Sequence, residues 1–213
     1  MSRVALVAGS TGLIGSDLLD LLLEDNSYSK VIALSRKPLD KVRSKLENIV
    51  VQSNGLSTYK NLQADDFYCC IGTTMHDAKT KEAFRKIDYD YPVSLATIAK
   101  TNGAKQFLLV SALGAEKRSG IFYNQVKGEV EEAISAMQFE TLHIFRPSLL
   151  MGPRQVHRAG EEAAKVFYKL FGFLIPAKYK GIASIKVVRA MISFARKNKP
   201  GTFIHESAEL QAF

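Results

Sequence analysis

The chain has 213 residues, of which 46% are hydrophobic and 23% are charged, so it is long enough for one α/β domain with a sizeable core. It does not open with a signal-peptide pattern, and no apolar run approaches the ~20 residues of a membrane span, so we expect a cytoplasmic protein without a membrane span. The net charge of +8 is concentrated in residues 154–213, which hold 11 basic and four acidic residues.

The N-terminal segment predicts a strand, a glycine-rich turn and a helix. Residues 3–8 form the short apolar run of a buried parallel strand, and residues 13–24 carry apolar side chains at helical spacing. In a dinucleotide-binding turn, one glycine permits the bend, a second lets a pyrophosphate approach the backbone, and a third lets helix and strand pack closely. We predict a pyrophosphate at this helix N-terminus, the alternative being a purely structural turn. The turn consists of Gly9, Ser10, Thr11, Gly12, Leu13, Ile14 and Gly15.

The second predicted strand, residues 30–35, bears on the choice of cofactor. NAD sites often place an acidic residue near the end of this strand to bind the ribose 2′-hydroxyl. This chain has Arg36 and Lys37 there. A guanidinium can bind a 2′-phosphate in a planar, bidentate manner, so the pair predicts NADPH in preference to NADH. The alternative is a solvated pair of cations in a loop.

The rest of the chain continues to alternate between strands and helices. Strands alternating with helices predict a doubly wound parallel sheet of the Rossmann type. We expect one NAD(P)-binding domain over residues 1–213, with a basic, mostly helical C-terminal part over residues 154–213. The further strands are predicted at residues 48–51, 66–71, 105–111, 139–145 and 202–205, and the helices at 81–100 with a kink at Pro92, 123–137, 158–172 and 182–198.

A proton-transfer site is predicted at the carboxyl ends of the central strands, where ligands bind in such sheets. Ser111 ends one strand, and Tyr123 and Lys127 are four residues apart on the next helix, so they share one face. Tyr123 would donate a proton to a substrate carbonyl, and the Lys127 ammonium would make the phenolate easier to form and hold the nicotinamide ribose. Ser111 would hydrogen-bond the carbonyl oxygen. The alternative for Tyr123 and Lys127 is a half-exposed helix face. Gly72 and Thr73, after residues 66–71, reach the same edge.

Four segments together resemble the atypical short-chain dehydrogenase/reductases, in particular the Tat-interacting-protein-like oxidoreductases. They are Cys69–Thr74, Tyr123–Glu129, Phe145–Pro147 and Val188–Met191. The resemblance implies NADPH binding by Thr11, Gly12, Leu13, Ile14, Arg36, Lys37, Ile71, Gly72, Tyr123, Lys127, Leu150 and Arg158. Related folds commonly carry an aspartate near the adenine where this chain has residues 52–54, Gln-Ser-Asn, so the adenine contacts stay open. The chain is also shorter than the extended sugar-nucleotide epimerases, which counts against nucleotide-sugar chemistry.

The leading hypothesis is an NADPH-dependent oxidoreductase acting on a small carbonyl or alcohol substrate. The alternative is a cofactor-loaded adaptor or redox sensor with little turnover, which the resemblance also supports. Its protein partner would dock on the basic C-terminal quarter, although that charge is equally explained as a solvated surface. No aromatic and basic stacking motif predicts nucleic-acid binding, and no spacing of cysteine, histidine and carboxylate residues predicts a metal site.

Overall fold

A computed structural model describes residues 2–51, 56, 59, 61–152 and 179–213. In this part of the chain seven strands form one sheet in the order β3-β2-β1-β4-β5-β6-β9, and every neighbouring pair is parallel. The predicted doubly wound parallel sheet is therefore confirmed. The strands are β1 (Arg3–Ala8), β2 (Tyr28–Ser35), β3 (Leu46–Val50), β4 (Asp66–Cys69), β5 (Gln106–Val110), β6 (Thr141–Arg146) and β9 (Gly201–Glu206).

The strand order reverses direction beside β1. The chain runs outward from β1 through β2 to β3, and then crosses to the other side of β1 to form β4. In open parallel sheets, ligands bind in the crevice outside the carboxyl ends of the strands where the order reverses. The loops that follow β1 and β4 therefore define the edge at which a ligand is expected.

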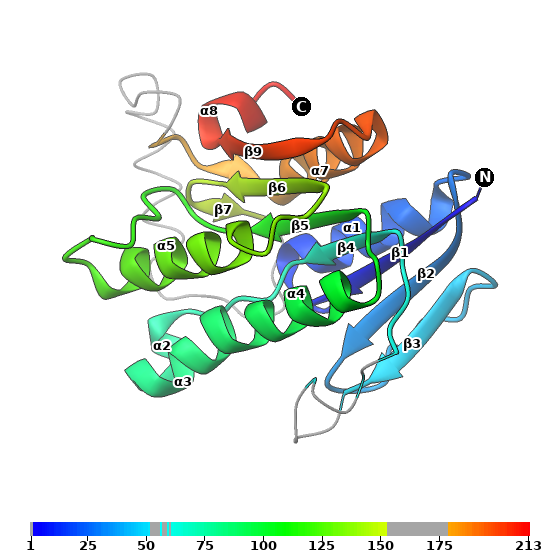
Figure 1. Ribbon diagram of the computed structural model, residues 1–213, viewed down its shortest axis with the longest axis horizontal. Coiled ribbons are helices and arrows are strands. Elements are labelled where there is room, and N and C mark those ends of the chain that lie inside the picture. Colours follow the sequence, from blue (N-terminus) through cyan, green and yellow to red (C-terminus); the bar gives the residue numbers. More distant parts are fainter. Residues whose placement is uncertain (1, 52–55, 57–58, 60, 153–178) are drawn as a thin grey trace.

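Helices cover both faces of the sheet (Figure 1). On one face α1 packs against α7, and Leu18 and Val188 belong to the same buried cluster. On the other face α4 packs against α5, and Leu95 and Val130 belong to a second buried cluster. Each helix buries the apolar stripe that its helical spacing creates, which is the main source of its stability. The longer helices are α1 (Leu13–Glu24), α4 (Tyr91–Thr101), α5 (Phe122–Ser135) and α7 (Ser184–Lys197).

The predicted helix over residues 81–100 is three successive segments. These are α3 (Lys81–Arg85), a π-helix η2 (Lys86–Asp90) and α4. Pro92 lies in the first turn of α4 and has no N–H, so it cannot donate the usual hydrogen bond to the carbonyl of Asp88. A turn of π-helix thus immediately precedes Pro92, the residue at which the kink is expected.

The remaining elements are short. β7 (Leu150–Met151) pairs in parallel with β8 (Ile182–Ala183), so the last long helix starts at Ser184 and not at residue 182 as predicted. α2 (Met75–Ala78) follows the β4 loop, and α8 (Ser207–Leu210) follows β9. The helix predicted over residues 158–172 lies outside the described residues.

Candidate functional site

The turn between β1 and α1 is built by two glycines that the fold itself requires. Gly9 has φ +81°, and a Cβ there would lie 2.5 Å from the carbonyl oxygen of Cys70. A Cβ on Gly15 would lie 2.1 Å from the carbonyl oxygen of Gly9. The loop after β4 and the first turn of α1 therefore pack directly against the end of β1.

The N-terminus of α1 is free to bind an anion. Gly12 is the N-cap, no side chain caps the helix, and no acidic residue lies in the first turn. The first N–H groups of a helix have no intrahelical partner, and the helix dipole favours negative charge there. Thr11 and Gly12 are exposed, whereas Ile14 is buried in the core. The Gly12 N–H donates to the Gly9 carbonyl oxygen over 3.0 Å, so the N–H groups of the first turn of α1 are the ones that fit a pyrophosphate.

Ser10 is part of the predicted cofactor turn, but its hydroxyl has a structural partner. The side chain is buried, and its Oγ donates to the carbonyl oxygen of Leu34 over 2.9 Å. Because Leu34 lies next to the end of β2, this bond fastens the glycine turn to the strand that leads to Arg36. Arg36 and Lys37 are both exposed, and neither has an ion-pair partner among the described residues.

The loop after β4 connects the cofactor edge to the predicted proton-transfer residues. Ile71 is half-buried, Gly72 is exposed, and the Thr73 N–H donates to Asp88 Oδ2 over 2.9 Å. Asp88 belongs to η2 and is fully buried. The buried Asp88 carboxylate thus anchors the loop, and the sequence analysis does not identify this residue.

Tyr123 and Lys127 lie on one face of α5, but their burial differs. Tyr123 is half-buried, with its ring centroid 5.5 Å from that of Phe84. Lys127 is buried, and its Nζ lies 2.8 Å from Asp88 Oδ1. Burial alone would lower the pKa of Lys127, but the carboxylate of Asp88, with smaller contributions from Tyr123 and Cys69, more than compensates, so the pKa is raised. Tyr123 and Lys127 are thus a phenol beside a buried ammonium.

Ser111 lies in a different hydrogen-bond network. Its buried hydroxyl donates to Glu131 of α5, whose carboxylate also binds Arg146 at 3.0 Å from Nε. Arg146 in turn contacts Glu206 at 3.0 Å. Glu131 lies eight residues after Tyr123, which is about 12 Å along a helix. A hydroxyl has one proton, so Ser111 cannot donate to Glu131 and to a substrate carbonyl at once. Its catalytic role stays a prediction.

Leu150 is the remaining predicted cofactor residue that the structure describes. Leu150 is half-buried and lies in β7, next to Ile182 of β8. Leu13 of the glycine turn reaches this segment, since a Cβ on Gly152 would lie 2.8 Å from a Leu13 methyl carbon. Arg158 and residues 52–54 lie outside the described part of the chain.

Asp88 is the residue of this site that sequence reasoning missed. It lies four residues after Phe84 and four before Pro92, and all three are buried. A carboxylate on the apolar face of a predicted helix is rarely buried without a cation, and this was the available signal. In the described residues no group of three or more His, Cys, Asp or Glu side chains could hold a metal ion. The same residues contain no helix long and apolar enough to span a membrane.

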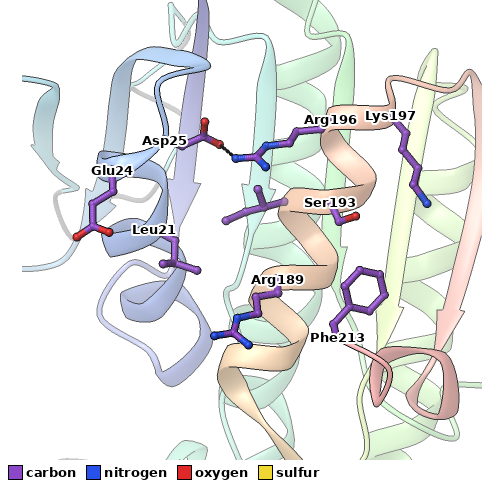
Figure 2. Close-up of a pocket in the computed structure, with 9 residues that line it drawn as sticks. Leu21, Glu24, Asp25, Arg189, Ser193, Arg196, Lys197 and Phe213 are labelled. Carbon is purple, nitrogen blue, oxygen red and sulfur yellow. Dashed lines mark hydrogen bonds and ion pairs between the residues drawn. The ribbon is translucent and has the colours of Figure 1, made fainter.

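A surface groove lies away from the cofactor edge. A groove of about 700 Å³ runs between the end of α1 and α7, with Arg189, Arg196 and Lys197 on its α7 side (Figure 2). Arg196 forms an ion pair with Asp25 at 2.8 Å, so part of the basic charge is neutralised within the protein. The groove lies at the C-terminal end of α1, about 18 Å along the helix from Gly12, and is separate from the cofactor edge.

Comparison with known proteins places this arrangement in a family. Residues 5–171 match the NAD dependent epimerase/dehydratase family. This chain belongs to that family. Protein HTATIP2 of Rattus norvegicus is 36% identical over 199 residues, which cover 90% of this chain and 81% of the relative. Protein FMP52-1, mitochondrial, of Scheffersomyces stipitis is 32% identical over 217 residues, covering 97% and 96% of the two chains.

Solved structures share the fold. The Bordetella bronchiseptica enzyme WbmH, in complex with NAD⁺, superposes with a TM-score of 0.75 and 15% identity, covering 97% of this chain and 76% of WbmH. The similarity to HTATIP2 confirms the resemblance to the Tat-interacting-protein-like branch, and the family description agrees with the predicted dinucleotide-binding fold. Because the FMP52 relatives are named mitochondrial, the cytoplasmic location of this chain stays a prediction.

Proposed function

We propose that this protein is an NADPH-dependent oxidoreductase that interconverts a carbonyl and an alcohol, with Tyr123 as the proton donor in reduction. The observation that carries the proposal is the buried Lys127 side chain, four residues after Tyr123 on α5, whose Nζ lies 2.8 Å from Asp88 Oδ1. This pair lies beneath the loop after β4, at the edge where ligands bind in such sheets. A cation held there stabilises the phenolate that forms when Tyr123 releases its proton.

The cofactor would be held along the same edge. The uncapped N-terminus of α1 would bind the pyrophosphate through Thr11, Gly12 and Leu13, and Arg36 and Lys37 would bind the 2′-phosphate. Ile71, Gly72 and Leu150 would contact the remainder. When bound, the nicotinamide supplies the hydride, so the protein supplies orientation and proton chemistry.

Replacing Tyr123 by phenylalanine tests the proton donor. The ring and its contact with Phe84 remain, so folding and NADPH binding should change little. Turnover of a carbonyl substrate, first found by screening aldehydes, ketones and quinones for NADPH oxidation, should fall by about 10²-fold or more. Tyr59→Phe removes the hydroxyl of another tyrosine and should leave turnover unchanged. Equal turnover by Tyr123→Phe and the wild type would refute the mechanism.

A second candidate function is an NADPH-loaded adaptor or redox sensor. The observation that favours it is the commitment of the Ser111 hydroxyl to Glu131, because it leaves the predicted Ser-Tyr-Lys set without its third member beside Tyr123. The exposed cations of α7 would then contribute to a surface for an acidic protein partner. Tight NADPH binding with no turnover across the same screen would favour this function over the enzyme.

A further inference from the structure

The carboxylate of Asp88 divides its two oxygens between the cofactor loop and the proton-transfer helix. Oδ2 accepts a hydrogen bond from the Thr73 N–H over 2.9 Å, and Oδ1 lies 2.8 Å from Lys127 Nζ. Gly72 covers the pair, since a Cβ there would lie 3.4 Å from Asp88 Oδ1 and 3.7 Å from Lys127 Nζ. One side chain therefore links the loop after β4, η2 and α5.

Two contacts of equal spacing align the continuous α3–η2 segment with α5. Phe84 and Asp88 are four residues apart, as are Tyr123 and Lys127, and Phe84 contacts Tyr123 just as Asp88 contacts Lys127. Phe84, Asp88 and Lys127 are all buried. Tyr123 and Lys127 share one face of α5, so packing of Phe84 on Tyr123 brings the following η2 turn, and with it Asp88, against Lys127.

We propose that Asp88 is a positioning residue that keeps the Lys127 ammonium charged and fixed beside Tyr123, an inference that rests on the proposed function. An isolated buried ammonium releases its proton more readily, because burial disfavours the charged form. A neutral Lys127 would no longer stabilise the Tyr123 phenolate.

The other groups that act on Lys127 do not supply a negative charge. They are Tyr123 from the same helix and the Cys69 thiol from β4. Burial raises the pKa of the Cys69 thiol to about 12, so it is neutral at physiological pH. As the proposed proton donor, Tyr123 carries its proton before reduction. Among these groups, Asp88 provides the standing counter-charge.

Replacing Asp88 by asparagine separates its charge from its shape. The amide oxygen can still accept the Thr73 N–H, but Lys127 is left buried without an anion. The matched control is Asp90→Asn, which removes the same charge from an exposed position of η2. The direct measurement is an NMR titration of ¹³C-labelled lysine side chains in the cofactor-free protein, with the Lys127 signal assigned by its loss in Lys127→Met.

We expect the pKa of Lys127 to lie above its ordinary value in the wild type and in Asp90→Asn, and to be about 2 pH units lower or more in Asp88→Asn. As the pH is raised, Asp88→Asn should lose NADPH affinity and turnover at a lower pH than the wild type does. A purely structural role of Asp88 would instead lower both quantities equally at every pH. An unchanged Lys127 titration in Asp88→Asn would overturn the proposal.

A double substitution keeps the proposal testable if Asp88→Asn does not fold. Because the damage is then an unpaired buried cation, Asp88→Asn combined with Lys127→Met should recover a folded protein. A double variant no more stable than Asp88→Asn would contradict the proposed pairing. Failure of the wild type to bind NADPH would instead refute the proposed function, and the titration would still report whether Asp88 holds the Lys127 charge.

Discussion

Burial separates the basic side chains at the carboxyl edge of the sheet into two kinds. Lys127 and Arg146 are held by carboxylates of the protein, Asp88 and Glu131 respectively. Arg36 is exposed and has no ion-pair partner within the described residues. A cation already paired gains little from a ligand anion, whereas a free guanidinium can form two charge-assisted hydrogen bonds with a phosphate. Cofactor selection is therefore expected to depend on Arg36.

Arg36→Ala should weaken NADPH binding and leave NADH binding nearly unchanged. Loss of a charge-assisted phosphate contact costs on the order of 1.5–3 kcal/mol, which is about 10- to 100-fold in affinity. Fluorescence titration of both cofactors at one fixed ionic strength measures the difference. Arg43→Ala, an exposed arginine later in the same β2–β3 connection, is the matched control. Equal affinity of the wild type for NADPH and NADH would exclude the assignment of Arg36 and Lys37 to a 2′-phosphate.

At the scale of elements, periodicity predicts where helices and strands lie but not how a helix is wound. Predicted and observed ends agree within about two residues, as for α1 and β2, because apolar spacing and glycine turns fix these boundaries. The π-helix over residues 86–90 could not be predicted, since its hydrogen-bond register depends on packing against α5 and on Pro92. For the same reason the sequence predicts Tyr123 and Lys127 as a pair but does not show which groups Asp88 contacts.

For Ser111, the sequence predicts the position of the residue but not the hydrogen-bond partner of its side chain. Its place at the end of β5 is correctly predicted from the apolar run, yet the partner of its hydroxyl is chosen by tertiary contacts. Glu131 is drawn to the site by Arg146, which lies on the neighbouring strand β6. A local sequence pattern carries no information on such a carboxylate 20 residues away.

The β1–α1 turn allows ligand binding to be separated from folding. Gly12 has an ordinary φ of −77°, and a Cβ there would meet only the Gly9 carbonyl oxygen, at 3.3 Å. Gly12→Ala should thus change stability by about 1 kcal/mol or less, as expected for an N-cap, while its methyl group obstructs a pyrophosphate. We expect NADPH affinity to fall more than about tenfold, or about 1.4 kcal/mol.

Gly15→Ala is the contrasting variant, because its Cβ would lie 2.1 Å from the Gly9 carbonyl oxygen. Gly15→Ala should lower the thermal unfolding temperature, whereas Gly12→Ala should mainly lower affinity. Thermal unfolding and NADPH titration of both variants measure the two effects. Wild-type NADPH affinity in a folded Gly12→Ala protein would show that the turn is only structural.

Across the whole molecule, buried polar groups also lie away from the cofactor edge. At the amino end of the sheet, Tyr28 donates to Asp66 over 2.6 Å, and Arg3 also binds that carboxylate. Burial outweighs these contacts and raises the pKa of Asp66 to about 6. A carboxyl whose pKa is raised on folding favours the folded state at low pH, and this contribution is lost as the pH rises from about 4 to about 6.

Two hydrogen-bonded histidines, one on β6 and one on β9, have the opposite effect on the pH dependence of stability. His205 Nδ1 is 3.0 Å from Glu209, and His205 Nε2 is 2.9 Å from His143 Nδ1. If His205 donates to the carboxylate, its Nε2 accepts from His143, and His143 Nε2 is left without a hydrogen-bond partner within the described structure. Burial, with a smaller effect of His205, lowers the pKa of His143 from 6.5 to about 4.

A histidine whose pKa falls on folding must be neutral in the folded state, so its contribution to stability is complete above pH 6.5 and is lost as the pH falls through about 4. The loss is on the order of 3 kcal/mol for His143.

We expect His143→Phe, which suits the neighbouring rings of Phe145 and Phe203, to lose less stability between pH 7 and pH 4 than the wild type. The effect of Asp66 cancels in this comparison, and His205, whose pKa is also lowered by burial, retains part of the acid sensitivity. Urea unfolding at both pH values measures the difference, with the exposed His76→Asn as a control that should behave like the wild type. An equal acid-induced loss in His143→Phe and the wild type would show that His143 does not control acid stability.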